Sequence, residues 1–215
     1  MYHRGVRAAL KASSLVASPL LLLLGGCGRN PAKPVPQAYL FEKGKYQGIY
    51  GPDGRIMRLL YDQNGDGKAD MVTLFYPGGG APQQVEVDSD LDGIVDRWEY
   101  YAPDGHRERE GWARKKPGQV DEWEYVDARG RLTRREYDDD GDGRIDRIEY
   151  YENGELALVT VDSDHDGKMD RWQRWANRRI VREELDIDGD GIADRRLRYG
   201  PGGNVVSVEP IKSDW

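Results

Sequence analysis

A nine-residue pattern, Asp-x-Asp/Asn-x-Asp-Gly-x-x-Asp, occurs five times in this chain of 215 residues. Its copies begin at residues 62, 88, 138, 162 and 186, so successive starts are 26, 50, 24 and 24 residues apart. A degenerate copy at 113–121 fills the gap of 50 residues and keeps Gly118 and Asp121 at the sixth and ninth positions. Self-similarity at a fixed short period is the signature of a repeat architecture. We therefore expect an array of small units of 24–26 residues each.

The segments between these loops have room for only two short elements and a turn. Residues 97–101, 122–125 and 147–151 alternate charged residues with aromatic or aliphatic ones, a period that is typical of amphipathic strands. Turn sequences such as Pro103-Asp104-Gly105 and Glu152-Asn153-Gly154 follow and favour tight reversals. The prediction is an all-β fold, an antiparallel meander of about fourteen short strands with the loops along one edge and the turns along the other.

One face of this predicted sheet carries most of the aromatic residues. Its members on successive strands are Trp98, Tyr100, Trp123, Tyr125, Ile148, Tyr150 and Trp172. We expect this stripe to be a core, buried by curling or closure of the sheet. The alternative is an exposed platform that stacks sugars or binds a partner protein. The opposite face holds Arg97, Glu99, Glu122, Glu124, Arg147, Glu149 and Arg171, which we expect to form a solvated ladder of cross-strand ion pairs.

The loops have the composition of a calcium site. Calcium takes six to eight oxygen ligands at about 2.3–2.6 Å, and acids at alternate positions direct several carboxylates at one point. Glycine at the sixth position permits the backbone to turn over the ion. The candidate ligands, at positions one, three, five and nine, are Asp62, Asn64, Asp66 and Asp70; Asp88, Asp90, Asp92 and Asp96; Asp138, Asp140, Asp142 and Asp146; Asp162, Asp164, Asp166 and Asp170; and Asp186, Asp188, Asp190 and Asp194.

One alternative to calcium binding applies to the whole set of loops, and a separate question concerns the degenerate loop. A set of solvated acidic turns without metal would have a similar composition, since Asp, Asn and Gly populate turns in any protein. In the degenerate loop, Lys115 could replace the charge of the ion by pairing with Asp121, or the loop could simply have lost its function.

The loop pattern resembles the calcium loops of EF-hand, dockerin and thrombospondin type 3 proteins, and residues 62–70 look like the loops of integrin-type propellers. The resemblance covers the loops and not their surroundings. The EF-hand implies flanking helices, so short EF-hand-like helical repeats are the alternative fold, with Glu99 and Glu149 at the twelfth position where an EF-hand places a bidentate ligand. We favour strands because only about a dozen residues, broken by turns, separate that position from the next loop. Residues 125–132 and 151–156 also resemble the Tyr-Asp repeats of RHS-type proteins, which implies a long winding β-sheet.

The N-terminus has the order of an export signal. Basic residues precede an apolar run from Leu15 to Leu24 that is too short to span a bilayer permanently. The sequence Leu24-Gly25-Gly26-Cys27 resembles the lipobox of bacterial lipoproteins, which implies cleavage before Cys27 and attachment of acyl chains, such as palmitate, to that cysteine. The Gly after Cys27, where the family's inner-membrane members carry Asp, implies the outer membrane. The expected domains are a signal peptide at 1–26, a lipidated and Pro-rich tether at 27–45, the repeat domain at 46–209 and a tail at 210–215.

The charge balance and the residue inventory narrow the function. Residues 1–26 hold three basic side chains and no acid, which leaves 29 basic and 39 acidic side chains in the remainder and makes nucleic acid a poor partner. No phosphate-binding loop and no motif pairing a histidine with a nucleophile is found, so we expect no enzyme; a hydrolase that uses calcium for structure is the weakest alternative. The expected function is a calcium-binding, membrane-anchored lipoprotein with a structural or adhesive role at the bacterial cell envelope. The alternative is a module that binds polysaccharide or protein through the aromatic face.

Overall fold

The computed structural model describes residues 37–211, which form one sheet of fifteen strands. The strands are β1 (Tyr39–Lys43), β2 (Tyr46–Tyr50), β3 (Ile56–Tyr61), β4 (Met71–Phe75), β5 (Pro82–Val87), β6 (Arg97–Tyr101), β7 (Arg107–Trp112), β8 (Glu122–Val126), β9 (Leu132–Tyr137), β10 (Arg147–Glu152), β11 (Glu155–Val161), β12 (Arg171–Ala176), β13 (Arg179–Leu185), β14 (Arg195–Tyr199) and β15 (Val205–Pro210). The predicted β-meander is confirmed, and the alternative of EF-hand-like helical repeats is wrong, because residues 37–211 contain no helix.

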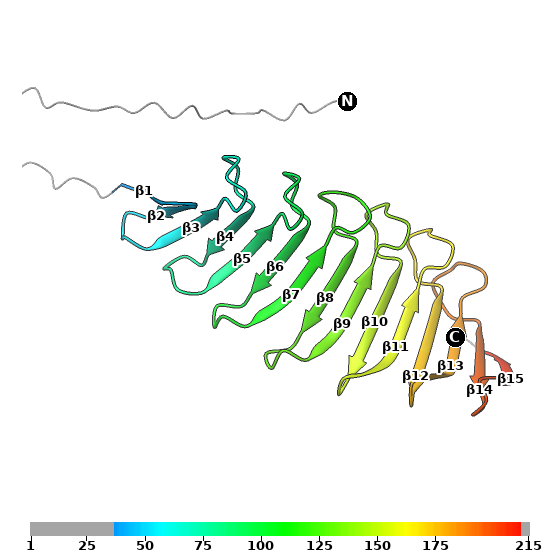
Figure 1. Ribbon diagram of the computed structural model, residues 1–215. Helices are drawn as coiled ribbons and strands as arrows, with labels where there is room; N and C mark the ends of the chain where they lie inside the picture. The colour runs from blue at the N-terminus through cyan, green and yellow to red at the C-terminus, as the bar shows by residue number, and fades with distance from the viewer. Residues whose placement is uncertain (1–36, 212–215) are drawn as a thin grey trace, which may run out of the picture. The chain divides into compact units, whose positions relative to one another are not determined.

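Each strand pairs antiparallel with its neighbours in chain order, from β1 to β15 (Figure 1). The five acidic loops and the degenerate loop each connect an odd-numbered strand to the next even-numbered one, so all of them lie along one edge of the sheet (Figure 1). The tight turns lie along the opposite edge. A meander of this kind is built from local pairings only, and it brings loops that are distant in sequence into one row.

The sheet starts earlier than the repeat pattern indicates. Strand β1 begins at Tyr39, within the segment expected to be a tether, and a turn at Gly44 with φ +62° joins it to β2. The expected signal peptide, Cys27 and the last four residues of the expected tail lie outside the described residues. Within residues 37–211 there is no helix that is long and apolar enough to cross a membrane.

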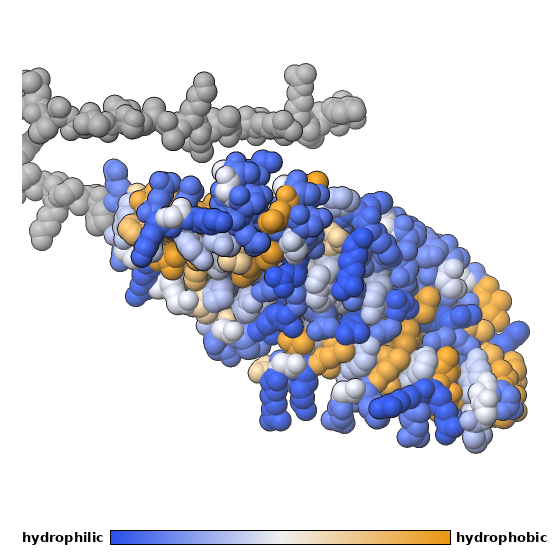
Figure 2. Space-filling view, viewed as in Figure 1, coloured by the Kyte–Doolittle hydropathy of each residue, from blue (hydrophilic) through white to orange (hydrophobic). Residues whose placement is uncertain are grey.

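The sheet has a single layer and very little hydrophobic core. Among the described residues, only Val72, Ala102 and Val159 are buried hydrophobic side chains. The two most buried large side chains are instead loop aspartates, Asp138 and Asp162, at 1% and 2% exposure. Figure 2 shows hydrophilic and hydrophobic patches interleaved over the visible face instead of one continuous apolar surface.

The expectation that the aromatic stripe forms a core is therefore wrong. The seven residues do share a face, since Trp98 and Trp123 are both paired with Gly111 and paired residues of antiparallel strands lie on the same side. They are only half-buried, because residues 37–211 form a single sheet and supply no second layer to cover either face.

The opposite face carries the expected cross-strand ion pairs. Examples are Arg135–Glu124 at 2.9 Å and Arg171–Glu183 at 3.2 Å. Their carboxylates are less solvated than expected, since Glu110 and Glu183 are each 6% exposed. Tyrosines of the next cross-strand row cover these carboxylates. For example, the Tyr199 hydroxyl donates a hydrogen bond of 2.6 Å to Glu183.

Two of the tight turns on the turn edge have positive φ angles at both central residues. Asn153-Gly154 has both φ angles positive, at 53° and 82°, as its sequence favours. The turn between β12 and β13 uses Asn177 and Arg178 at φ 51° and 60°, and it was not expected because it lacks glycine.

Candidate metal centres

Backbone hydrogen bonds continue the sheet pairing into the loop edge. The N–H of the ninth loop residue donates to the carbonyl of the residue before the loop, as from Asp146 to Tyr137 at 2.8 Å. The carbonyl of that ninth residue accepts the N–H of the first residue of the next loop, as from Asp162 to Asp146 at 2.7 Å. Neighbouring loops are thereby held side by side at a fixed register.

The first aspartate is the centre of each loop. Asp138 accepts N–H bonds from Gly141 at 2.5 Å, Asp142 at 3.1 Å and Gly143 at 2.8 Å. Equivalent bonds run from Gly67 to Asp62, Gly93 to Asp88, Gly167 to Asp162, and Gly191 to Asp186. The loop backbone thus wraps around one carboxylate, which explains why Asp138 is almost completely buried.

The other acidic positions also fix the loop backbone. Asp146, at position nine, accepts the N–H groups of Asp139 at 2.5 Å and Asp140 at 3.1 Å. Asp140 in turn accepts the N–H of Asp142, and Asp142 accepts the N–H of Arg144. These short-range bonds make the curved backbone on which the carboxylates converge.

Four loops bring three carboxylates together, with one oxygen from each lying within 4.8 Å of the other two. The groups are Asp88, Asp90 and Asp96; Asp138, Asp140 and Asp142; Asp162, Asp164 and Asp170; and Asp186, Asp188 and Asp194. Each group could hold a metal ion, and its donors are all carboxylate oxygens. The remaining fifth-position residues Asp92, Asp166 and Asp190 lie in the same loops and accept the N–H of the seventh residue.

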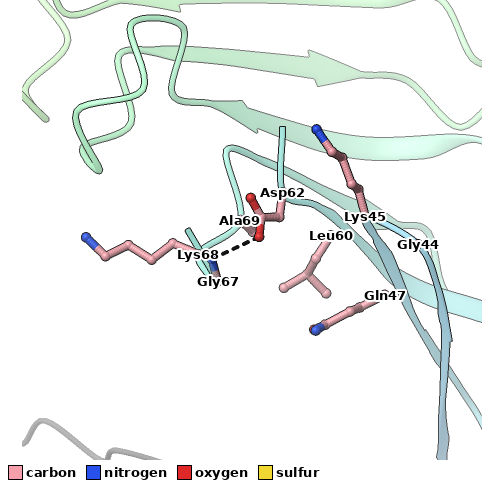
Figure 3. Close-up of a pocket in the computed structure, with 8 residues that line it drawn as sticks. All are labelled: Gly44, Lys45, Gln47, Leu60, Asp62, Gly67, Lys68 and Ala69. Carbon is pink, nitrogen blue, oxygen red and sulfur yellow. Dashed lines mark hydrogen bonds between the residues drawn. The ribbon is translucent and has the colours of Figure 1, made fainter. Parts of the chain in front are cut away.

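The first loop has the same backbone pattern but no such group of three acids. Asp70 accepts the N–H groups of Gln63 and Asn64, and Gly65 and Gly67 donate to Asp62. Asn64 takes the place of one carboxylate. Figure 3 shows this loop beside the β1–β2 turn, where Asp62, Lys45 and Leu60 are among the residues that line a pocket of about 130 Å³.

Glu99 and Glu149 do not join the loop carboxylates. Both lie within strands, on the face that carries the ion pairs, where Glu149 accepts a hydrogen bond of 2.6 Å from the Tyr151 hydroxyl. Neither is a member of a carboxylate group in the described part of the chain.

The degenerate loop keeps the hydrogen bonds of its ninth residue, although its other three acids are replaced. Asp121 accepts the N–H groups of Arg114 at 2.7 Å and Lys115 at 2.6 Å, as the ninth residue does elsewhere. The hypothesis that the Lys115 ammonium pairs with Asp121 is wrong, because this ammonium donates to the Asp138 carbonyl at 2.6 Å in the next loop. The Lys116 ammonium reaches the Gly141 carbonyl of the same loop. Two cationic side chains therefore tie the degenerate loop to its neighbour.

A further set of contacts between loops was not anticipated from the sequence. In two acidic loops, the cationic side chain at position seven donates to the carbonyl at position four of the next loop, from Arg144 to His165 at 3.0 Å and from Lys168 to Gly189 at 2.9 Å. The only sequence signal is the frequency of long cationic side chains at position seven.

His165, at position four, makes a different contact with the preceding loop, through its side chain. Its Nδ1 lies 2.9 Å from Asp146 Oδ1 and 3.7 Å from Asp140 Oδ2, so the three side chains form a mixed group of nitrogen and oxygen donors. The hydrogen bond to Asp146 raises the pKa of His165. Burial opposes ionisation of Asp146, but the bonds from His165 and from the loop amides outweigh it and lower the pKa of that carboxyl.

Comparison with known proteins assigns no family. No protein-family model and no curated protein matches the chain. Part of the chain is similar to a structure described as accessory secretory protein 1,2 and 3 in Streptococcus pneumoniae, with 14% identity and a TM-score of 0.28 over 59% of this chain and 21% of that one. A GtfA/B complex bound to UDP and GlcNAc is similar with 18% identity and a TM-score of 0.31 over 72% of this chain and 28% of that one. This chain spans less than a third of either chain, and at these scores no activity, ligand or partner carries over.

Proposed function

We propose that this chain is a calcium-binding structural or adhesive lipoprotein of the bacterial cell envelope. The proposal rests on which side chains the sheet buries. Three hydrophobic residues are buried among those described, whereas the loop carboxylates Asp70, Asp88, Asp138, Asp146 and Asp162 are all at most 5% exposed. A sheet without a hydrophobic core needs another source of stability, and cations bound in the loops would supply it.

The donor chemistry favours calcium among the common divalent ions. The four carboxylate groups offer hard oxygen donors only, and calcium and magnesium prefer such donors. Magnesium demands near-ideal octahedral geometry and keeps several of its waters, whereas calcium accepts the crowded, irregular sets of carboxylates that these loops present.

Bound calcium would act mainly on folding. Each site would stabilise the folded sheet by about 2.7 kcal/mol if free calcium is 100 times its dissociation constant. Five ions would add ten positive charges to the acidic chain and would remove the repulsion within each loop. Calcium at extracellular levels would thus fold and stiffen the sheet.

A calcium titration tests this role directly. The full chain would be melted thermally, with far-UV circular dichroism as readout, in EDTA and at increasing calcium concentrations. We expect the strand signal and the melting temperature to rise cooperatively in the micromolar to millimolar range. An unchanged melt without bound metal would overturn the calcium proposal and leave a self-sufficient sheet with acidic turns.

The envelope location rests on the lipobox-like sequence before Cys27. Expression of the chain in a bacterium with labelled palmitate should give a labelled protein in the outer-membrane fraction, and Cys27→Ala should abolish the label. An unlabelled, unprocessed wild-type chain would contradict the lipoprotein proposal without bearing on calcium.

The uncovered aromatic face supports a second candidate, a module that binds envelope polysaccharide or protein. Trp98, Trp123 and Trp172 are half-buried, and no second layer formed by residues 37–211 lies above them. Collisional quenching of tryptophan fluorescence by acrylamide in saturating calcium measures whether these indoles are accessible. Strong protection from the quencher would argue against the platform.

A further inference from the structure

One cross-strand row on the aromatic face alternates tyrosine with arginine from β6 to β10 and continues with one leucine and three arginines from β11 to β14. Direct pairing places Tyr100, Arg109, Tyr125, Arg134, Tyr150, Leu158, Arg174, Arg182 and Arg198 opposite one another on the nine consecutive strands from β6 to β14. We call these nine residues the arginine–tyrosine row. Neighbouring strands lie about 4.8 Å apart, so the row is about 38 Å long.

The row contains no acid, although the chain as a whole is acidic. The acids of this face lie in the neighbouring cross-strand row, where Glu136 is 3.1 Å from Arg134 and Glu184 is 3.6 Å from Arg182. Among the described residues, Arg109 and Arg174 make no ion pair within 4.0 Å, and the Arg174 side chain is exposed. Arg198 also lies 3.6 Å from Glu209, so the positive charge that the described part of the fold leaves without a carboxylate partner is that of Arg109 and Arg174.

Part of this arrangement works against the stability of the sheet. Arg174 pairs with Arg182, and Arg182 with Arg198, so three like charges are directly opposite one another on adjacent strands. Like charges in this position are destabilising. Glu184, at 3.6 Å from Arg182, and Glu209, at 3.6 Å from Arg198, offset part of this repulsion. An external anion beside Arg174 would offset the remainder.

Two guanidinium groups of the row, those of Arg109 and Arg134, stack on aromatic rings. Arg109 lies 4.3 Å from the ring centre of Tyr100 and 4.7 Å from that of Trp123, and Arg134 lies 3.9 Å from that of Tyr125. Arg109, Tyr125, Arg134 and Tyr150 line one open hollow of about 620 Å³ on this face, together with four residues that include His106 and one exposed acid, Glu108. Stacked cations retain free N–H donors at their edges, beside the exposed parts of aromatic rings.

We propose that the arginine–tyrosine row binds an acidic polysaccharide laid across the strands. The guanidinium groups would pair with carboxylate or other anionic groups of the polymer, and sugar rings would pack on the tyrosines between them. This inference rests on the second candidate function and gives it a ligand class. It does not depend on the identity of the ion in the loops.

Charge density favours a polysaccharide over a nucleic acid. A nucleic acid carries one negative charge per nucleotide, and duplex DNA carries one per about 1.7 Å of its axis, so it would need a broad basic surface. The row is a single residue wide, and the acids Glu86, Glu136 and Glu184 lie in the neighbouring row of the same face. A polymer with sparse charges and apolar ring faces matches this pattern better.

Binding of the full chain to three immobilised polymers tests the ligand class. In saturating calcium, biolayer interferometry would compare hyaluronate, which is acidic, with dextran, which is neutral, and with a single-stranded oligothymidylate. We expect hyaluronate to bind, with an affinity that falls as salt rises, and dextran to bind much more weakly. Equal binding of dextran and hyaluronate would keep a saccharide surface but overturn the acidic ligand class. Tighter binding of oligothymidylate, or binding of none of the three, would overturn the proposal.

Paired variants test the position of the site. Arg174→Gln with Arg198→Gln should weaken hyaluronate binding by about fivefold or more. The control, Arg129→Gln with Arg195→Gln, makes the same charge change at exposed positions away from the row, in a turn and on the opposite face. Tyr150→Leu removes a ring of the row without a charge change and should also weaken binding. Equal loss in the control pair would show a nonspecific charge effect and overturn the site.

Discussion

At the scale of single residues, the loop aspartates differ in what they do. Asp138 accepts three backbone N–H bonds and is 1% exposed, whereas Asp140 accepts one such bond and is exposed. Both belong to the same carboxylate group. The first position therefore organises the backbone of the loop as well as offering a ligand.

This difference predicts that two substitutions, each of which removes one carboxylate ligand, lower the free energy of unfolding by different amounts. Asp138→Ala leaves three amide donors without an acceptor, at about 1–3 kcal/mol for each buried one, so we expect a loss of about 3 kcal/mol or more. Asp140→Ala should cost clearly less. Urea unfolding in saturating calcium measures both, and because each variant removes one carboxylate of the group, the comparison isolates the hydrogen bonds. Equal losses would show that only the ligand charge matters.

Three tyrosines on the ion-pair face predict a response at alkaline pH. Burial and a hydrogen bond to Glu99 or Glu149 raise the pKa of Tyr101 and Tyr151 to about 12, and the bond to Glu183, with burial, does the same for Tyr199. These groups favour the folded state fully below pH 10, the ordinary tyrosine value, and this contribution is lost as the pH rises through 12.

Titration of tyrosine absorbance near 295 nm should resolve a late class of ionisations, and unfolding should accompany it. Tyr151→Phe should remove one member of that class. If every tyrosine ionised near pH 10 while the sheet stayed folded, the covering role assigned to these rings would be wrong.

At the scale of elements, each acidic loop has two residues with positive φ. Position six is glycine in all six loops, with φ between 75° and 96°. Position four has φ of 61° to 82° in the five acidic loops, and it is occupied by Leu91 or His165 in two of them and by glycine in the others. The first requirement is strict because its angles extend beyond the left-handed region that side chains tolerate.

Substitutions in one loop should reproduce this contrast. Gly143→Ala, at φ +96°, should destabilise the sheet by about 2 kcal/mol. Gly141→Asn, at φ +79°, should cost less than about 1 kcal/mol because Asn tolerates this region. Urea midpoints in saturating calcium measure both changes. A larger loss in Gly141→Asn would contradict the ranking of the two positions.

Most elements of the sheet, but not all, could be predicted from the sequence. The loops and most strands were predictable because Asp and Gly positions repeat and the strands alternate with a period of two. Strand β1 was missed because it lies outside the repeat, and the Asn177-Arg178 turn was missed because no glycine marks it. The absence of a core could not be predicted either, since an aromatic stripe looks the same whether or not a second layer covers it. The contacts of Lys115 and His165 depend on which loops become neighbours, and only the folded sheet determines that.

At the scale of the whole sheet, each strand contacts only its two neighbours in the chain. The stability of such an array is close to a sum of local terms, so the sheet can lose structure in one part and keep it in another. The degenerate loop is joined to the next loop by lysine side chains, and these contacts need no metal. Lys115 and Lys116 tie it to residues 138–146, and so connect β7 and β8 with β9 and β10.

Removal of calcium should therefore leave the middle of the sheet most protected. In EDTA, we expect hydrogen exchange to be slowest for amides of β7 to β10 and faster for strands toward both ends. Lys115→Ala with Lys116→Ala should abolish this difference. Lys168→Ala is the control, because its bond to the Gly189 carbonyl joins two loops that are both proposed to need the ion. Uniform exchange along the sheet in EDTA, or an equal effect of the control, would mean that the degenerate loop is an ordinary connection and that the array melts as one unit.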